Sequence, residues 1–332
     1  MRTGLGRDVR GVVGAVTLVL RYHEARSRAL FRELDANPSL LLLGGAVALP
    51  FNPDDGLLER YAEQILWPPI SEFATAAAAI GAAMAGLRTL VPISTSSFMF
   101  YGWAPIVNEA PNVRYLSGGA ASAPVTFHVM AGSRRGGAAQ HEHTPQAMLH
   151  NVPGLRVLAP GTPADVDGAV HSALTGDDPT IIVDNVRLAE FEGPVGSSPA
   201  DIRLPTLLRD GSDALIVSYS LMVQQALLAA GLLATDGIAA AVLDVAQLAP
   251  LPHAELVAAT EQHDAVLFVD ESRAAGSPAS HMLARVVQAR PGVAARLLCT
   301  LDAPAPFAPA LVDQIVPGPA QIAAEVRALL GR

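Results

Sequence analysis

Two side chains in the first half of the chain, Glu72 and His141, are candidates for proton transfer because of the segments in which they stand. Glu72 ends the loop Pro69-Ile70-Ser71-Glu72 and precedes a long alanine-rich run that is typical of a helix. Its apolar neighbours Ile70 and Phe73 predict an environment poor in water, in which a carboxyl favours its protonated form. The ordinary interpretation is a glutamate stabilised by the helix dipole, and Glu72 alone does not exclude it.

His141 ends a glycine-rich segment, and an imidazole can exchange protons near neutral pH. Glycine lets a backbone turn tightly or come close to a ligand. Taken alone, His141 would be an ordinary hydrogen-bonded histidine of a loop. The next residues, Glu142 and His143, complete a His-Glu-His triplet that invites a metal interpretation. Alternate residues in a loop are weak evidence, and no further ligand cluster is visible, so we predict no metal held by side chains. The segment reads Gly132-Ser133-Arg134-Arg135-Gly136-Gly137-Ala138-Ala139-Gln140-His141.

Uniformly apolar runs alternate with helical patterns along the chain, which predicts parallel sheets covered on both faces. The predicted strands are 40–43, 90–93, 125–130, 155–160, 180–183, 214–219, 239–245 and 265–270. The predicted helices are 21–36, 56–65, 71–88, 163–174, 222–233, 253–261, 279–289 and 320–330.

The fold class that follows is α/β, with two doubly wound α/β domains. The 332 residues suffice for two domains of ordinary size. A segment rich in proline, serine and glycine and without periodicity, 190–205, is predicted to link them. We therefore expect domains at 20–189 and 206–332, preceded by an N-terminal extension of unknown role at 1–19.

The composition argues against several classes of function. A net charge of −9 is unfavourable for binding nucleic acid, which needs a basic face. Hydrophobic residues make up 51% and charged residues 16%, which suits extensive buried surface or a large subunit interface. The single cysteine, Cys299, cannot form an internal disulfide and stands in an apolar run, so we interpret it as a buried small hydrophobe of a cytosolic protein.

The apolar run 11–20 follows Arg2, Arg7 and Arg10, as in a signal peptide. No small-residue cleavage site comes after it, and the run is too short to span a bilayer. We therefore expect a soluble, cytoplasmic protein without a membrane partner.

The order and spacing of these motifs resemble the beta subunits of thiamine diphosphate-dependent 2-oxo acid dehydrogenases, the pyruvate, branched-chain and acetoin enzymes of the transketolase-like superfamily. The resemblance covers about residues 20–330. The segments that carry it are 69–88, 94–101, 132–141, 151–160, 177–181, 211–213, 217–219, 248–251, 270–273 and 301–309.

The resemblance implies a transketolase-like pyrimidine-binding domain followed by a transketolase C-terminal-like domain. It implies that Glu72 contacts the aminopyrimidine of the cofactor and that Phe98 packs on that ring. It also makes His141 the active-site histidine. Ile70 and Tyr101 are further candidate cofactor contacts, and the candidate contacts to substrate or acyl acceptor are Gln140, His143 and Arg135.

The chain departs from the family at several positions near this site. Glu142-His143 replaces Ser-Gln, Gly44-Gly45-Ala46 replaces Gly-Glu-Asp, Ala104-Pro105 replaces Asp-Gln, and Asn151 replaces histidine. These changes put the usual acceptor or substrate in doubt.

The Gly-Asp-Gly motif with its downstream asparagine, which grips Mg²⁺ and diphosphate, is absent from the sequence. In the family that the chain resembles, a separate alpha subunit carries this motif. We therefore expect an obligate hetero-oligomer of two alpha and two beta subunits, with Mg²⁺ bound mainly by the partner. A K⁺ ion on backbone oxygens near Ala173, Gly176 and Asp178 is a further expectation of the resemblance.

The favoured function is thus the beta subunit of an oxidoreductase that decarboxylates a 2-oxo acid and transfers the acyl group to a lipoyl acyltransferase. Two alternatives remain open: a two-chain enzyme of transketolase type that transfers acyl or ketol groups in a specialised pathway, and a non-catalytic structural partner. The sequence does not identify the 2-oxo acid, the acceptor or any larger complex.

Overall fold

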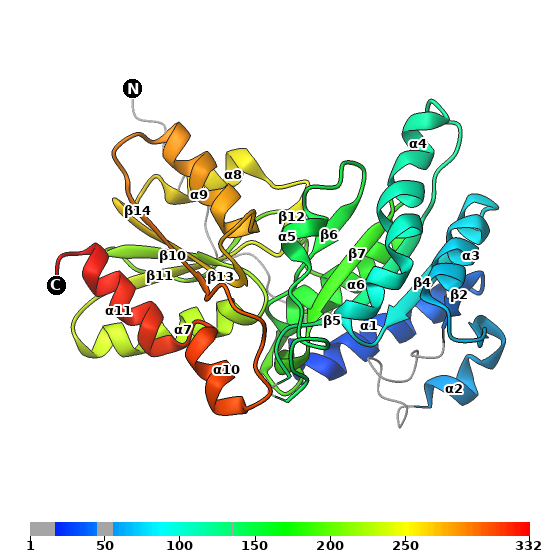
Figure 1. Ribbon diagram of the computed structural model, residues 1–332, viewed down its shortest axis with the longest axis horizontal. Coiled ribbons are helices and arrows are strands. Elements are labelled where there is room, and N and C mark those ends of the chain that lie inside the picture. Colours follow the sequence, from blue (N-terminus) through cyan, green and yellow to red (C-terminus); the bar gives the residue numbers. More distant parts are fainter. Residues whose placement is uncertain (1–16, 45–55, 135) are drawn as a thin grey trace.

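A computed structural model describes residues 17–44, 56–134 and 136–332 of the chain (Figure 1). It contains two parallel-rich sheets with helices on both faces, which confirms the predicted α/β class. Among the described residues, no helix combines the length and the apolar character needed to cross a bilayer.

The first sheet has the strand order β12-β6-β7-β5-β4-β2-β3. Six of these strands run parallel, and β12 pairs antiparallel with β6 at one edge. The strands are β2 (Leu40–Leu43), β3 (Ile65–Leu66), β4 (Arg88–Ile93), β5 (Val125–Ala131), β6 (Arg156–Leu158), β7 (Thr180–Asn185) and β12 (Gln247–Ala249).

Helices cover both faces of this sheet because alternate strand residues are apolar on each side. On one face lie α1 (Tyr22–Ala36) and α6 (Pro163–Thr175), whose buried residues share a core with Leu42 and Ile182. On the other face lies α3 (Glu72–Met84), which packs through Ala76, Ala79 and Ile80. Three short helices complete this half: α2 (Leu57–Arg60), α4 (Val113–Leu116) and α5 (Gln146–Leu149).

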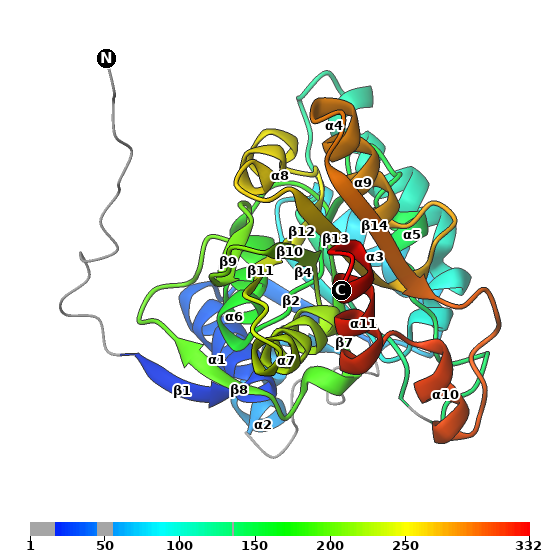
Figure 2. The same cartoon turned by 90° about the vertical axis from the view of Figure 1, so that its left-hand side faces the viewer.

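The second sheet has the order β14-β13-β10-β11-β9 and is parallel except for β9 at its edge. Its strands are β9 (Thr206–Arg209), β10 (Ala214–Ser218), β11 (Ala240–Asp244), β13 (Ala265–Arg273) and β14 (Ala294–Thr300). Figure 2 shows the helices on either side of it. These helices are α7 (Leu221–Thr235), α8 (His253–Thr260), α9 (Pro278–Ala289), α10 (Pro309–Ile315) and α11 (Pro319–Leu329).

Some predicted elements differ from the structure. The predicted helix 56–65 ends at Arg60, because Tyr61 leaves the helical conformation (φ −118°), and a 3₁₀ turn, Ala62–Gln64, follows. The predicted linker contains β8 (Glu192–Val195), which pairs antiparallel with β1 (Leu18–Arg21). Strand β14 was not predicted, although its residues are partly apolar.

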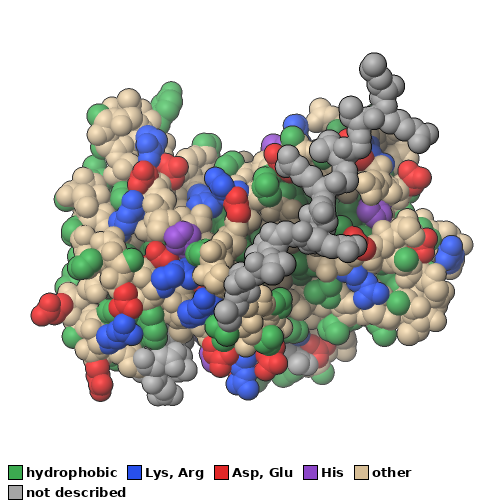
Figure 3. All heavy atoms as spheres, turned by 180° about the vertical axis from the view of Figure 1, so that it is seen from behind, with side chains coloured by type: hydrophobic (Ala, Val, Ile, Leu, Met, Phe, Trp, Pro, Cys, Tyr) green, Lys and Arg blue, Asp and Glu red, His purple; other side chains and the backbone are tan. Residues whose placement is uncertain are grey.

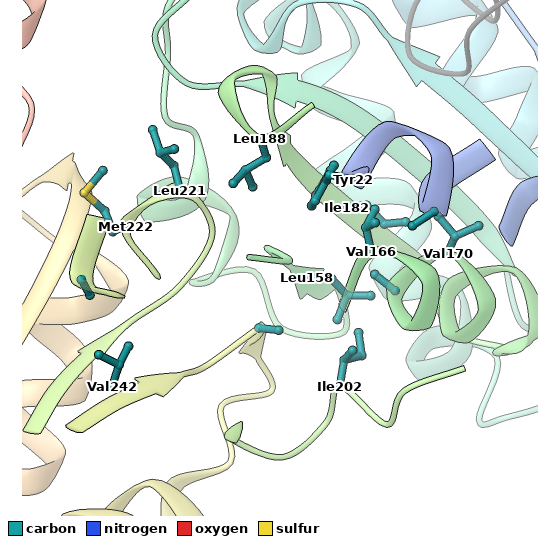
Figure 4. Packing of buried hydrophobic residues seen from close by; sticks show 14 of the residues in the cluster. Tyr22, Leu158, Val166, Val170, Ile182, Leu188, Ile202, Leu221, Met222 and Val242 are labelled. Atoms are coloured by element: carbon teal, nitrogen blue, oxygen red, sulfur yellow. The ribbon is translucent and has the colours of Figure 1, made fainter. Parts of the chain in front are cut away.

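The two halves share one continuous apolar core. Leu158 and Ile182 of the first sheet belong to the same buried cluster as Leu221 and Met222 of α7 and Val242 of β11 (Figure 4). Strand β12 also comes from the second half of the chain and completes the first sheet. The position of one sheet therefore depends on the packing of the other.

Surface charges pair locally with charges of opposite sign. Arg203 contacts Asp201 at 2.7 Å, and Arg327 contacts Asp236 at 2.6 Å. Figure 3 shows acidic and basic side chains interspersed on the rear face. Exposed pairs of this kind contribute little to stability.

A buried charged cluster joins α1 to the first sheet. Arg26 Nη1 donates to Asp184 at 2.6 Å, and His128 Nε2 lies 2.9 Å from the same carboxylate oxygen. Burial would raise the pKa of Asp184, but the charge of Arg26 and the hydrogen bond with His128 outweigh it and lower the pKa to about 2. Burial lowers the pKa of His128.

We expect this cluster to make the fold acid-labile. The folded-state pKa of Asp184 lies below its unfolded value, so its stabilisation is present above about pH 4 and is lost as the pH falls towards the folded value. Asp184→Asn should remove this dependence and cost about 3–5 kcal/mol at neutral pH, because it breaks a buried ion pair by removing the carboxylate that Arg26 contacts. Urea unfolding of both proteins across this pH range measures the effect.

The matched control is Asp302→Asn, since Asp302 is exposed and its ion pair with Arg273 is 3.7 Å long. Its free energy of unfolding should change by less than about 0.5 kcal/mol. Equal losses in the two variants would contradict a special role for the buried cluster.

Candidate functional site

Glu72 is the first residue of α3, and local sequence explains why the helix begins there. The Ser71 side chain accepts a hydrogen bond from Ala74 N at 3.3 Å, as an N-cap does. The alanines that follow have high helix propensity. Glu72 is half-buried, and its backbone packs so closely on Gly102 that a Cβ at position 102 would lie 3.1 Å from Glu72 O.

Phe98 lies on a 3₁₀ helix, Ser96–Gly102, that directly follows the carboxyl end of β4. Between it and Glu72 is a pocket of about 270 Å³. The pocket is lined mainly by apolar groups, with the Glu72 carboxyl among the few charged or polar ones; Ile70, Val91 and Ile93 contribute to its walls. An acid beside a flat aromatic side chain in an apolar hollow can bind a flat heterocycle that carries a hydrogen-bonding nitrogen.

His141 lies on the loop that follows β5, the strand beside β4. Its ring meets the edge of Phe98 in a T-shaped arrangement, with the ring centroids 5.8 Å apart. A second hollow is lined by Phe98, Tyr101, Gln140, His141 and His143 together with Ser97 and Phe100. Phe98 therefore lines both a pocket that contains an acid and one that contains two imidazoles.

Polar contacts tie the 3₁₀ helix to the glycine-rich loop. Ser96 Oγ donates to His143 O at 2.9 Å, and Gly132 N donates to the same oxygen at 3.2 Å. The Arg134 guanidinium donates to Ser94 O at the end of β4. Phe98 and His141 are held in register by these bonds as well as by packing.

The structure thus brings most of the predicted site residues together. Ile70 is 92% exposed and Tyr101 72% exposed, so both stand at the rim of the hollows rather than inside them. Gln140 and His141 are exposed as well. Arg135 lies outside the described residues, as do Gly45 and Ala46.

The side chains of the His-Glu-His triplet do not converge on one point. Glu142 is buried and accepts hydrogen bonds within the loop, whereas the His143 ring packs edge-on against Phe100 at 5.4 Å. Burial and the charge of Arg273 lower the pKa of His143, so it is neutral at physiological pH. Within the described part of the chain, no group of three or more His, Cys, Asp and Glu side chains is placed to hold a metal ion.

Sequence reasoning missed the acids of the second half that support this site. Glu271 of β13 accepts a hydrogen bond from Ser133 N at 3.2 Å and another from the Asn185 side chain. The sequence motif 270–273, to which Glu271 belongs, does not by itself indicate this role. Asp165 of α6 and Asp244 of β11 also meet at the boundary between the halves, where burial raises both pKa values.

Comparisons with known proteins place this geometry in a family. A model of the transketolase pyrimidine binding domain matches residues 19–190, and a model of the transketolase C-terminal domain matches residues 206–322. The beta subunit of acetoin:2,6-dichlorophenolindophenol oxidoreductase from Cupriavidus necator is 33% identical over 321 residues, with 91% of this chain and 95% of that subunit covered. This chain belongs to the family of 2-oxo acid dehydrogenase E1 beta subunits. The family is one of transketolase-like thiamine diphosphate enzymes, and the resemblance seen in the sequence is confirmed.

Other members are nearly as similar. The E1 beta subunit of pyruvate dehydrogenase from Rickettsia felis is 32% identical, with 75% of this chain and 78% of that subunit covered. The beta subunit of 2-oxoisovalerate dehydrogenase from Bacillus subtilis is 29% identical, with 94% and 98% covered. A solved structure of a split gene transketolase, an inactive beta4 tetramer, matches with a TM-score of 0.78 at 22% identity, covering 94% of this chain and 98% of that one. At that identity the match concerns the fold alone.

In this E1 beta-type chain, the loop expected to hold K⁺ already has hydrogen-bond donors. Thr126 Oγ1 donates to Ala173 O at 3.2 Å, and Arg88 donates to Gly176 O. Thr180 Oγ1 donates to Asp178 O at 3.0 Å.

Two of the surrounding groups are themselves cations. Arg114 Nε donates to the Asp178 carboxylate at 2.9 Å, and Arg88 Nη2 donates to the Asp177 carboxylate at 2.8 Å. Guanidinium groups at these positions would repel a potassium ion. These donors and cations disfavour the potassium site that the resemblance implied, which stays a prediction.

We expect the thermal stability of the protein to be the same in KCl and in NaCl at equal concentration. Arg88→Met should lower the melting temperature, because it removes donors to Gly176 and Asp177. Arg285→Met, on the exposed side of α9, is the matched control and should leave it unchanged. A rise in melting temperature specific to K⁺ in the wild-type protein would show that the loop does bind the ion.

Proposed function

We propose that this chain is the beta subunit of a thiamine diphosphate-dependent 2-oxo acid dehydrogenase and forms its active site with a separate alpha subunit. The observation that carries the proposal is that Phe98 lines both the pocket of Glu72 and the hollow of His141, at the carboxyl edge of the first sheet. Ligands bind at this edge in open α/β sheets. The relatives above, which are named as beta subunits of 2-oxo acid enzymes, support the same assignment.

The residues of the first pocket fit the aminopyrimidine half of thiamine diphosphate. Glu72 would hydrogen-bond a ring nitrogen, Phe98 would pack on the ring, and Ile70 would cover it from the rim. When bound, thiamine diphosphate supplies a nucleophilic carbon that adds to the 2-oxo group and accepts the electrons released on decarboxylation.

His141 would hold or deliver a proton at the reacting end of the substrate, across Phe98 from Glu72. Gln140 and Tyr101 share its hollow and would orient a substrate or acceptor through hydrogen bonds. His143, neutral because of burial and Arg273, can accept or donate a hydrogen bond without adding charge.

The proposal includes an alpha subunit, because the sequence lacks the diphosphate and Mg²⁺ motif and the rim of the site is apolar and exposed. The exposed fractions are 54% for Trp67, 92% for Ile70, 54% for Phe73 and 72% for Tyr101. Exposed apolar patches of this kind mark interaction surfaces. Two alpha and two beta chains, with Mg²⁺ bound by alpha, remain our proposed arrangement.

The cofactor test uses Glu72→Gln in the complex with the alpha-type subunit from the same source. Decarboxylation of 2-oxo acids should fall about 100-fold or more, in the range lost with a general acid–base group, while the complex still forms. Calorimetric binding of thiamine diphosphate with Mg²⁺ should be detectable in the wild-type complex and absent for this chain alone.

The control variant is Glu63→Gln, an exposed glutamate outside the pocket, which should keep full activity. Unchanged turnover by Glu72→Gln would refute the catalytic assignment and favour the structural-partner alternative. Tight binding of the cofactor by the lone chain would refute the divided site.

A second experiment identifies the acceptor. We propose that the acceptor is a lipoyl group. The wild-type complex, supplied with a branched-chain or pyruvate-type 2-oxo acid, should therefore acylate a free lipoyl domain. His141→Ala should reduce this transfer more than it reduces decarboxylation measured with an artificial electron acceptor. Acyl or ketol transfer to an aldehyde in place of the lipoyl domain would favour the transketolase-type alternative.

A further inference from the structure

Glu142 is a buried acid whose carboxylate accepts hydrogen bonds, among the described residues, from the loop that carries His141. Its side chain is 7% exposed. Gly136 N donates to Oε1 at 3.0 Å and Gly137 N donates to the same oxygen at 2.7 Å. The Ser133 hydroxyl donates to Oε2 at 2.6 Å. Hydrogen bonds to a charged acceptor are about twice as strong as neutral ones, so the carboxylate fixes the path of this loop.

A short chain of contacts runs from Glu142 to the imidazole of His141. Glu142 accepts a hydrogen bond from Gly137 N, and the carbonyl oxygen of the same residue lies 3.2 Å from His141 Nδ1. His141 N donates to Ala138 O at 3.1 Å and closes the turn. Moving the residue 137 backbone would therefore move the histidine ring.

The Gly137 contact also selects a tautomer. A carbonyl oxygen only accepts hydrogen bonds, so Nδ1 must carry the hydrogen when it bonds to Gly137 O. The neutral ring then presents an unprotonated Nε2, which can accept a proton from a substrate. A neutral histidine side chain in water prefers the opposite tautomer, with the hydrogen on Nε2.

The loop needs such a clamp because its backbone is strained. Ala138 has φ +57°, a left-handed conformation that a residue with a Cβ adopts at a cost. Glycine fits closely at position 137, since an added Cβ would lie 3.0 Å from Glu142 Cγ and 3.2 Å from His141 Cβ and would push these atoms away. The carboxylate and the glycine fit each other.

We infer that Glu142 is a positioning residue that sets the orientation and the Nδ1–H tautomer of His141. The geometric part of this inference stands on the loop contacts, and its consequence for turnover rests on the proposed function. It also gives a reason for one departure from the family pattern, where serine occupies this position.

The direct test is nitrogen NMR of the full chain labelled with ¹⁵N-histidine, at alkaline pH where ordinary imidazoles are neutral. The His141 signals are assigned by their loss in His141→Asn. The wild-type chain should show the Nδ1–H pattern. Glu142→Ala should shift His141 towards the Nε2–H pattern, and Glu142→Gln should keep the wild-type pattern, because its amide oxygen accepts from the backbone and its NH₂ donates to Ser133.

Gly137→Ala tests the same contact from the other side and should also shift the His141 tautomer. The matched control is Glu33→Gln, which alters another buried glutamate, ion-paired with Arg32 on α1. It should lower the melting temperature and leave the His141 signals unchanged. This variant distinguishes an effect of lower protein stability from an effect of a displaced His141 ring.

In the complex with the alpha subunit, Glu142→Ala should lower kcat about 10- to 100-fold with little change in KM. This loss is part of the rate enhancement that a general acid–base group contributes. Glu142→Gln should restore most of it. If the wild-type complex does not turn over 2-oxo acids, the proposed function is wrong. The NMR result then still decides whether Glu142 positions His141. An unchanged His141 tautomer in both Glu142→Ala and Gly137→Ala would overturn the inference itself.

Discussion

The parallel pairing of β2, β4 and β5 is the constraint on which the candidate site depends. Parallel strands end at the same edge of a sheet, so the segments that follow them must lie side by side. Here those segments are Gly44 after β2, the 3₁₀ helix of Phe98 after β4 and the loop of His141 after β5. Helices on both faces bury the strands and leave this edge open. Glu72 follows β3, which pairs parallel with β2, so an acid and an imidazole that are far apart in sequence both come near Phe98.

Packing places these segments, but hydrogen bonds decide their final positions. Arg134 reaches Ser94 O, Ser96 holds His143 O, and Glu142 closes the glycine-rich loop. A typical net hydrogen bond contributes only about 1 kcal/mol, whereas a buried polar group without its partner costs more than that. The site therefore tolerates exchange of one partner for a similar group far better than its deletion.

Apolar periodicity predicted most of the strands and helices, because buried parallel strands and amphipathic helices are local patterns. It missed β14 and the pairing of β1 with β8, which joins residues that are far apart in sequence. Family resemblance indicated Glu72, Phe98 and His141, and the structure brings them together. The roles of Glu142 and Glu271 could not be predicted, since a carboxylate bound by backbone N–H groups leaves no mark on composition or spacing. The guanidinium groups that reach Asp177 and Asp178 from other strands and loops could not be predicted for a related reason, and the potassium site stays a prediction of the resemblance.

The departures from the family pattern have a physical meaning that bears on whether the site works. Random drift in a subunit without chemistry would seldom place a carboxylate in a buried position, because an unpaired buried charge is costly. Glu142 instead has three matched donors, and Gly137 leaves the room that its side chain requires. The substitution and its surroundings are mutually adjusted. The loop that shows this adjustment positions the imidazole of His141. The adjustment therefore argues for a site under selection for proton transfer and against a chain retained only for its interface.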